Sequence, residues 1–217
     1  MSTYVLIHGA GSDGWYWHRV APLLRERGHD VVAPDLPVGD ERAGLAVYTN
    51  AVLDAIGDRE DLVVVAQSLG GFVGPLVCAR RDVGLLVLLN AMVPRPGETD
   101  WWAATGHPVE IGPDFDPVRV FLHDVPPDVV AEAGAHAGPQ AGTPMAEPWP
   151  LERWPDVPTR FVLARQDRFF PAAWQRGVVR DRLGIEPDEL DGGHCVALSR
   201  PEELVALLER LRATAGA

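Results

Sequence analysis

The sequence has no lysine, and all 19 of its basic residues are arginine. This absence excludes any mechanism that requires a lysine side chain, including that of reductases with a Tyr-x-x-x-Lys motif. The chain has only two cysteines, Cys78 and Cys195. Two cysteines at this spacing form no disulfide framework and match no common metal site, so we expect neither disulfide bridges nor a bound metal.

Excess positive charge and long apolar runs are also missing. The net charge is −12, whereas a surface that binds nucleic acid or an anionic membrane needs basic residues. The longest apolar segment, 83–93, is interrupted by Gly84 and Asn90 and is too short to span a bilayer. The sequence starts with a strand pattern, without a charged leader or an apolar targeting segment. We therefore expect a cytoplasmic protein without a nucleic-acid or membrane partner, and its oligomeric state stays open.

What the chain does contain is an alternation of short apolar segments and helical patterns. Its 217 residues, 47% of them hydrophobic, suit a single domain (1–217) with a sizeable core. The apolar segments predict strands near 3–8, 30–34, 62–67, 84–90, 159–164 and 185–190. The helical patterns between them fall near 15–28, 43–57, 69–82, 171–183 and 201–213. This alternation predicts an α/β fold, a three-layer sandwich with a mostly parallel sheet of about six strands and helices on both faces.

The segment from about 91 to 155 interrupts this alternation. It holds many of the prolines and several aromatic residues, among them Trp101, Trp102 and Phe121. Only 127–137 has a convincing helical pattern. A long irregular excursion in a compact domain is usually functional or disordered, and the aromatic residues argue against disorder. We expect this segment to form a small lid over the carboxyl edge of the sheet.

Ser68 lies where the strand predicted over 62–67 meets the next helix. Small residues surround it, with Ala66 two positions before it and Gly70 and Gly71 after it. A serine on such a sharp strand-to-helix turn presents its hydroxyl at the edge of the sheet, while small neighbours let the backbone close around it. Because the motif also occurs in ordinary turns, a nucleophilic role requires a histidine, an orienting acid and an oxyanion site elsewhere in the chain.

Among the seven histidines, His194 is the best candidate for the base. It follows two glycines in the loop after the last predicted strand, which places it at the same sheet edge as Ser68. Asp167 also follows a strand at this edge and is the best candidate for the acid that orients the histidine. Asp191 is a lesser candidate. It lies only three residues before His194, where we expect it to stabilise the glycine loop instead. Asn90 ends another strand there and offers no acid.

The loop after the first strand allows a dinucleotide-binding interpretation. Gly9, Gly11 and Gly14 form a G-x-G-x-x-G between a strand and a helix, and Asp35 ends the next strand about 20 residues later. Three aromatic residues, 15–17, follow the motif directly, where the third glycine should allow a helix and a strand to pack closely. This weighs against a dinucleotide site but leaves it as a competing hypothesis.

The same loop can instead form half of an oxyanion hole. A glycine after His8 lets the chain turn tightly and leaves the next amide pointing into the site, while His8 itself faces the loop backbone as a structural residue. Acyl transfer needs two donors aimed at the developing negative charge on oxygen. The predicted donors are the backbone amides of Ala10 and Leu69.

Ser68, Asp167 and His194 occur in the order nucleophile, acid, histidine, which is that of the α/β-hydrolases. The chain resembles this superfamily and, within it, the small lidded branch that includes plant methyl-ester esterases and hydroxynitrile lyases. The further residues that carry the resemblance are His8-Gly9-Ala10 with Trp15 and Trp17, Gly28-His29, Pro34-Asp35-Leu36, Pro171 and Gly193. The resemblance covers about 1–90 and 156–214 and leaves the lid uncovered.

This resemblance implies a serine hydrolase that cleaves a small uncharged carboxylic ester or related acyl compound through an acyl-enzyme on Ser68, without a cofactor or metal. Ala66 replaces the family's usual glycine, and we expect the turn to survive because alanine is small. Cyanohydrin cleavage is disfavoured, because the oxyanion loop holds Ala10 rather than a threonine and the chain has no lysine. Two alternatives stay open, a non-catalytic small-molecule binding module on the same fold and a dinucleotide-binding oxidoreductase that uses residues 9–14.

Overall fold

The computed structural model describes residues 1–215, and the strands within them form one sheet. Its strands are β1 (Thr3–Ile7), β2 (Asp30–Val32), β3 (Leu62–Gln67), β4 (Val83–Leu89), β5 (Thr159–Ala164) and β6 (Asp188–Leu190). The strand order is β2-β1-β3-β4-β5-β6, and every neighbouring pair is parallel. The predicted α/β fold is confirmed. The edge strands β2 and β6 are shorter than predicted, and β4 begins one residue earlier.

The central strands are apolar along their length because helices cover both faces of the sheet. Every residue of β1 and of β3 is buried. The chain places β2 on one side of β1 and β3 on the other. The connections from the carboxyl ends of β1 and β3 therefore run in opposite directions. In open α/β sheets, ligands bind in the crevice that forms at such a switch point.

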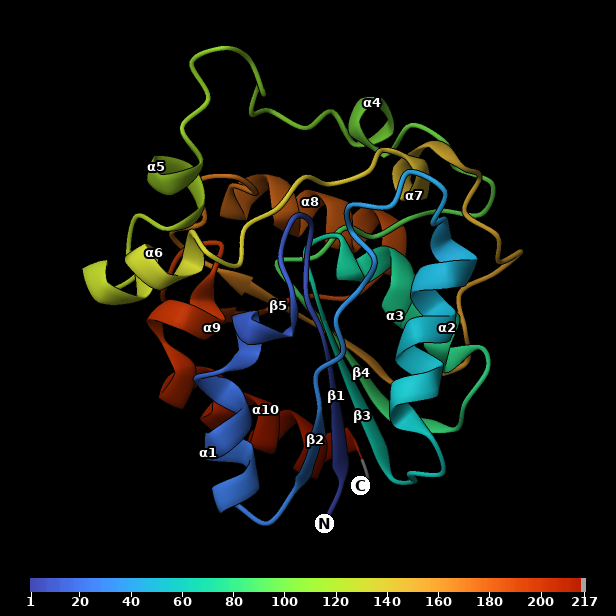
Figure 1. The fold of residues 1–217 in the computed structure, drawn as a ribbon. Coiled ribbons are helices and arrows are strands. Elements are labelled where there is room, and N and C mark those ends of the chain that lie inside the picture. The colour runs from blue at the N-terminus through green and yellow to red at the C-terminus, as the bar shows by residue number, and fades with distance from the viewer. Residues whose placement is uncertain (216–217) are drawn as a thin grey trace.

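Two layers of helices enclose the sheet (Figure 1). Side chains of successive strand residues point to opposite faces of the sheet and so pack against the two helix layers in turn. Tyr4 and Leu6 belong to one core cluster, and Val5 and Ile7 belong to the other. The first layer consists of α1 (Val20–Glu26), α9 (Val196–Ser199) and α10 (Pro201–Ala215), and the second of α2 (Leu45–Ile56), α3 (Gly70–Cys78) and α8 (Ala172–Leu183). No helix within residues 1–215 combines the length and apolar character needed to cross a bilayer.

Two of the predicted helices differ from the observed ones. The pattern over 15–28 is divided into a 3-10 turn, η1 (Gly14–Trp17), and α1. The Asp13 carboxylate caps η1 by accepting a hydrogen bond from the Trp15 amide at 2.9 Å, which ends the glycine loop directly. α3 ends four residues before the predicted end at position 82, with Pro75 in its second half. Proline lacks an amide proton, so Pro75 cannot donate to the Gly71 carbonyl one turn earlier, which weakens this short helix.

The chain between β4 and β5 is more helical than predicted. It contains α4 (Trp101–Thr105), α5 (Pro117–Phe121), α6 (Pro127–Ala133) and α7 (Thr143–Ala146). Only α6 coincides with the pattern predicted over 127–137, and it ends four residues earlier. The other three have four or five residues each, too few to give a periodic pattern, and side chains of Asp100 and Asp116 cap two of them. Figure 1 shows this segment passing over the carboxyl ends of the strands.

Two buried tryptophans tie this segment to the core. The Trp101 indole donates a hydrogen bond to the Val93 carbonyl at 3.0 Å, and the Trp149 indole donates one to the Phe72 carbonyl at 3.1 Å. Because both rings are almost fully buried, the segment is packed on the domain at both of its ends.

Candidate active site

Ser68 occupies a sharp turn between β3 and α3. Its φ of 51° lies in the left-handed region, which a non-glycine residue adopts only where the surrounding structure holds it. Its amide donates to the Leu89 carbonyl at 3.2 Å, and its carbonyl accepts from the Met92 amide at 2.9 Å. A Cβ on Gly71 would lie 2.0 Å from the Met92 carbonyl oxygen, so a larger residue would displace the turn. The turn forms with Ala66 in place of the family's usual glycine.

Three side chains predicted to act together are in contact. His194 Nε2 lies 3.1 Å from Ser68 Oγ, and His194 Nδ1 lies 2.8 Å from Asp167 Oδ2. All three residues are buried. The other oxygen of Asp167, Oδ1, accepts hydrogen bonds from the amides of Phe169 and Phe170 at 2.8 and 2.9 Å. Since the carboxylate is held from both sides, it fixes the proton of His194 on Nδ1 and leaves Nε2 as an acceptor for the serine hydroxyl.

Asn90 organises the loops that carry the histidine and the acid, a role that the sequence did not reveal. Its Oδ1 accepts from the Ala164 amide at 2.7 Å, at the end of β5. Its Nδ2 donates to the carbonyls of His194 and Gly193 at 3.1 and 3.3 Å. Asn90 is fully buried and has a φ of 42°. A buried polar residue at the end of a central apolar strand was the available signal.

The amides of the glycine loop before His194 donate to residues other than Asp191. The Gly193 amide donates to Asp124 Oδ2 at 2.7 Å, and the Gly192 amide donates to the side-chain oxygen of Gln166. Asp191 instead accepts from the side chains of Arg165 and Gln166 at the surface. Asp191 therefore supports the glycine loop through Gln166, which it holds in place, rather than through a bond of its own to the loop amides. The hydrogen bonds from Gln166 and Arg165 hold the pKa of Asp191 below its ordinary value.

His8 is a structural residue, as predicted. Its Nδ1 lies 2.8 Å from the Gly9 carbonyl, and its Nε2 accepts from the Leu36 amide at 3.1 Å. Both ring nitrogens are thus occupied, and burial lowers the pKa of His8. Asp35 also supports the first loop, because its Oδ1 accepts from the Gly14 amide at 2.8 Å.

The glycines of the first loop are used for close contacts inside the protein. A Cβ on Gly9 would lie 2.8 Å from the Ser68 Cβ, and one on Gly14 would lie 2.5 Å from the Ala33 carbonyl oxygen. The Gly11 amide is not free to bind a ligand, because it donates to Gln140 Oε1 at 3.1 Å. Two loop amides that a dinucleotide phosphate could use, those of Gly11 and Gly14, are therefore already bonded. In the described residues, the amides of Ala10 and Leu69 have no hydrogen-bond partner.

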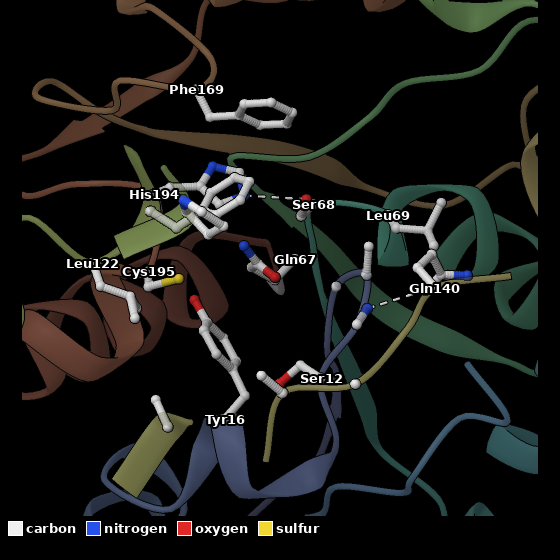
Figure 2. A pocket seen from close by; sticks show the side chains of 18 of the residues that line it. Ser12, Tyr16, Gln67, Ser68, Leu69, Leu122, Gln140, Phe169, His194 and Cys195 are labelled. Atoms are coloured by element: carbon white, nitrogen blue, oxygen red, sulfur yellow. Dashed lines mark hydrogen bonds between the residues drawn. The ribbon is translucent and has the colours of Figure 1, made fainter. Parts of the chain in front are cut away.

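A cavity of about 660 Å³ opens over Ser68 and His194. Its walls are predominantly apolar and come from the first loop, the segment between β4 and β5, and the loops after β5 and β6 (Figure 2). Its apolar lining includes Met92, Trp102, Phe115, Phe121 and Phe169. Phe170, the next residue in the chain, packs behind Phe169 against Trp101 and does not line the cavity.

Cys195 lines the cavity, although it directly follows His194 in the chain. The turn that begins α9 directs consecutive side chains of this loop to the same space. Burial raises the pKa of the Cys195 thiol well above its ordinary value, so the thiol stays protonated and acts as an apolar wall. Cys78 lies on α3 outside the cavity, and burial raises its pKa to about 12. Residues 1–215 contain no group of three or more His, Cys, Asp or Glu side chains arranged to hold a metal ion.

Comparisons with known proteins identify chains similar to this one. The family model described as "Alpha/beta hydrolase family" matches residues 4–207. The chain is 28% identical over 253 residues to probable esterase PIR7A of Oryza sativa subsp. indica, with 97% of this chain and 96% of the relative covered. It is 26% identical over 250 residues to salicylic acid-binding protein 2 of Nicotiana tabacum, with 94% and 95% covered. The crystal structure of a pyrethroid hydrolase matches with a TM-score of 0.81 at 25% identity, with 100% of each chain covered.

Proposed function

Because the chain belongs to the alpha/beta hydrolase family, as its sequence led us to expect, we propose that it hydrolyses small uncharged carboxylic esters through an acyl-enzyme on Ser68. The observation that carries this proposal is the continuous chain of contacts from Ser68 Oγ through His194 to Asp167, at 3.1 and 2.8 Å, on the floor of an apolar cavity. Relatives named as esterases support the same reaction class.

In the proposed first step, His194 Nε2 takes the proton of the Ser68 hydroxyl as its oxygen attacks the ester carbonyl. Asp167 stabilises the imidazolium that forms and keeps the ring in place. His194 then gives the proton to the departing alkoxide, and the alcohol leaves. Water enters, loses a proton to His194 and attacks the acyl-enzyme, which releases the carboxylic acid and restores Ser68.

The negative charge on the carbonyl oxygen is proposed to be received by the amides of Ala10 and Leu69. Both amides are without a partner in the described residues, and they flank the nucleophile from two different loops. The close passage of Gly9 against the Ser68 Cβ brings the first loop to the required side of the nucleophile. Donors fixed in this way need no reorganisation when the charge develops, which is the main source of rate enhancement in such sites.

The segment 91–155 is proposed to act as a lid within a single domain and to select the substrate. Its aromatic residues Trp102, Phe115 and Phe121 form one wall of the cavity. An apolar enclosure of this kind disfavours ionised substrates, because burying an unpaired charge there carries a large free-energy penalty. The preferred substrate is therefore an ester without a charged group.

The test is the substitution Ser68→Ala. We expect wild-type protein to hydrolyse p-nitrophenyl acetate or butyrate and to react with a fluorophosphonate probe. Ser68→Ala should lose the labelling and at least about a thousandfold of the hydrolysis rate. Hydrolysis that persists at the wild-type rate in this variant would contradict the mechanism. An ester chain-length series run beside it would show how deep the acyl pocket is.

A second candidate function is ligand binding without turnover. It is favoured by the similarity to a protein named for binding salicylic acid and by the enclosed cavity. Saturable binding of a small aromatic acid or ester, with no fluorophosphonate labelling of Ser68, would support this function over hydrolysis.

A further inference from the structure

Gln67, the residue directly before the nucleophile, places a polar side chain in the apolar cavity. It is only 3% exposed and lines the cavity. Within residues 1–215 its carboxamide makes no hydrogen bond to the protein. Its Oε1 lies in the space that Gly9 leaves free, 2.5 Å from where a Cβ of that residue would be. The carboxamide nitrogen is then left to donate into the cavity.

Tyr16, on η1, supplies a second unused donor to the same cavity. The residue is 4% exposed and lines the cavity. Its buried hydroxyl makes no hydrogen bond of standard geometry, although the Ala197 amide is close enough to act on its oxygen, so its proton is not donated to any protein group. Burial raises the pKa of Tyr16 well above its ordinary value, so the hydroxyl keeps its proton. Among the buried side-chain atoms of residues 1–215 that lack a partner, this oxygen alone belongs to a residue that lines the cavity. In Figure 2 the Tyr16 ring points from η1 toward Cys195, and Gln67 lies between Tyr16 and Ser68 in this view.

A buried donor without an acceptor destabilises a protein, because it loses its hydrogen bonds to water and gains none in return. The Tyr16 hydroxyl is such a donor, and the Gln67 carboxamide faces the same cavity without a protein partner, so a polar pair beside the nucleophile needs an explanation beyond packing. A bound molecule with an oxygen acceptor at this position would satisfy both. A carboxylate would not suit the site. The negative charge of Asp167 is already felt at Tyr16, and the apolar walls cannot solvate a second negative charge.

We propose that Gln67 and Tyr16 form a polar subsite that binds a neutral oxygen of the substrate, an ether, ketone or hydroxyl oxygen separate from the ester group itself. This deepens the proposed ester hydrolysis and rests on it. The substrate class is then an oxygen-substituted ester rather than a simple alkyl ester. The hydroxyl of Tyr16 and the carboxamide of Gln67 determine specificity and take no part in the transfer of the acyl group.

The experiment compares esters that differ only by an oxygen in place of a methylene group. In the acyl series the pair is p-nitrophenyl 3-methoxypropanoate and p-nitrophenyl pentanoate. In the alcohol series it is 2-methoxyethyl butyrate and butyl butyrate. The oxygen preference is the ratio of the two kcat/KM values, divided by the same ratio for hydrolysis by hydroxide, which removes the intrinsic reactivity of the esters.

We expect an oxygen preference in one of the two series, which identifies the part of the substrate that occupies the subsite. Gln67→Leu and Tyr16→Phe should each reduce that preference by about fivefold to tenfold, the effect of one hydrogen bond in a dry site. Tyr4→Phe, the same change on a buried tyrosine of β1 whose hydroxyl donates to Glu209 of α10 away from the cavity, should leave the ratio unchanged. The proposal would be overturned if neither Gln67→Leu nor Tyr16→Phe changed the oxygen preference in either ester series.

Two further measurements test the subsite independently of ester hydrolysis and of protein stability. Calorimetric binding of the same ester pairs to Ser68→Ala protein reports the subsite without turnover, and Gln67→Leu in that background should abolish the preference for the oxygen ester. If the wild type hydrolyses no ester, the proposed function fails and this binding preference still decides the subsite. The ligand-free Tyr16→Phe variant should have a Tm equal to or above that of the wild type, because the hydroxyl it loses donates to no protein group. A Tm several degrees lower would reveal a structural partner and count against the proposal.

Discussion

Replacing Asn90 by aspartate tests the loop geometry behind the site. The change keeps the size of the side chain and the oxygen that accepts from the Ala164 amide at 2.7 Å. It removes the Nδ2 donor, which lies 3.1 Å from the His194 carbonyl and 3.3 Å from that of Gly193. At neutral pH a carboxylate oxygen would face two carbonyl oxygens in a fully buried position. We expect this arrangement to raise the pKa of the introduced carboxyl strongly, through burial and repulsion from the carbonyl oxygens.

The sign of the pH dependence follows from this shift. The unfolded chain releases the proton of an aspartic acid near pH 3.9, about the ordinary value, whereas the folded chain retains it to higher pH. The folded state therefore binds more protons in this range, and the stability of Asn90→Asp falls as the pH rises. When protonated, the carboxyl can still donate to one of the two carbonyls. We expect a loss of about 1–2 kcal/mol relative to wild type at pH 5, and roughly 2–3 kcal/mol more at pH 8.

The assay is urea unfolding followed by tryptophan fluorescence, at pH 5 and pH 8, for the wild type, Asn90→Asp and Asn90→Ala. Alanine removes all three hydrogen bonds without adding a titrating group, so its loss relative to wild type should not depend on pH. Both variants should also lose about tenfold or more in kcat/KM at pH 7.5, since small displacements of a catalytic group are costly. A stability difference for Asn90→Asp that is the same at both pH values would refute the assignment of Nδ2 to the two carbonyls.

Three further predictions concern single residues. Asp167→Asn should lower kcat by about 10⁴-fold with little change in KM for p-nitrophenyl butyrate, because the proton of His194 moves to the wrong nitrogen; a loss below tenfold would argue against Asp167 as the orienting acid. Gly71→Ala should unfold at clearly lower urea concentration and label poorly with fluorophosphonate, since its Cβ would lie 2.0 Å from the Met92 carbonyl oxygen; wild-type labelling would show that the turn can adapt. Because burial lowers the pKa of His8, the neutral ring stabilises the folded protein above about pH 6.5 and loses this contribution as the pH falls; the fall in stability between pH 7.5 and pH 5, measured by urea unfolding, should be smaller in His8→Gln.

The strands and the mostly parallel sheet could be predicted because β1, β3 and β4 are buried along most of their length and appear as short, mainly apolar segments. The relation of Ser68, Asp167 and His194 could be predicted for a related reason. In a parallel sheet, residues that directly follow strands meet at one edge, whatever their separation in the chain. Both inferences depend on strand periodicity alone and require no knowledge of the packing.

The lid and the supporting residues could not be predicted in this way. Helices such as α4 and α7 have four or five residues, and their positions depend on caps and on anchors such as Trp101 rather than on periodicity. Asn90 acts through hydrogen bonds to residues more than 70 positions away in the chain, which no local pattern encodes. The direction of the Cys195 side chain depends on the turn that opens α9 and cannot be inferred from its position next to His194.

The segment 91–155, which is proposed to act as a lid, also contacts the loop after β1 that carries the proposed oxyanion donor Ala10. The Gly138 amide donates to the Gly11 carbonyl at 2.9 Å, and Gln140 accepts from the Gly11 amide at 3.1 Å. His136 Nδ1 lies 2.8 Å from the Asp13 carboxylate just beyond. The segment that lines the substrate cavity therefore also positions the backbone next to the proposed oxyanion donor Ala10. If segment 91–155 selects the ester as proposed, a change there that admits a different ester must preserve these contacts. We therefore expect specificity and rate to be coupled through residues 136–140.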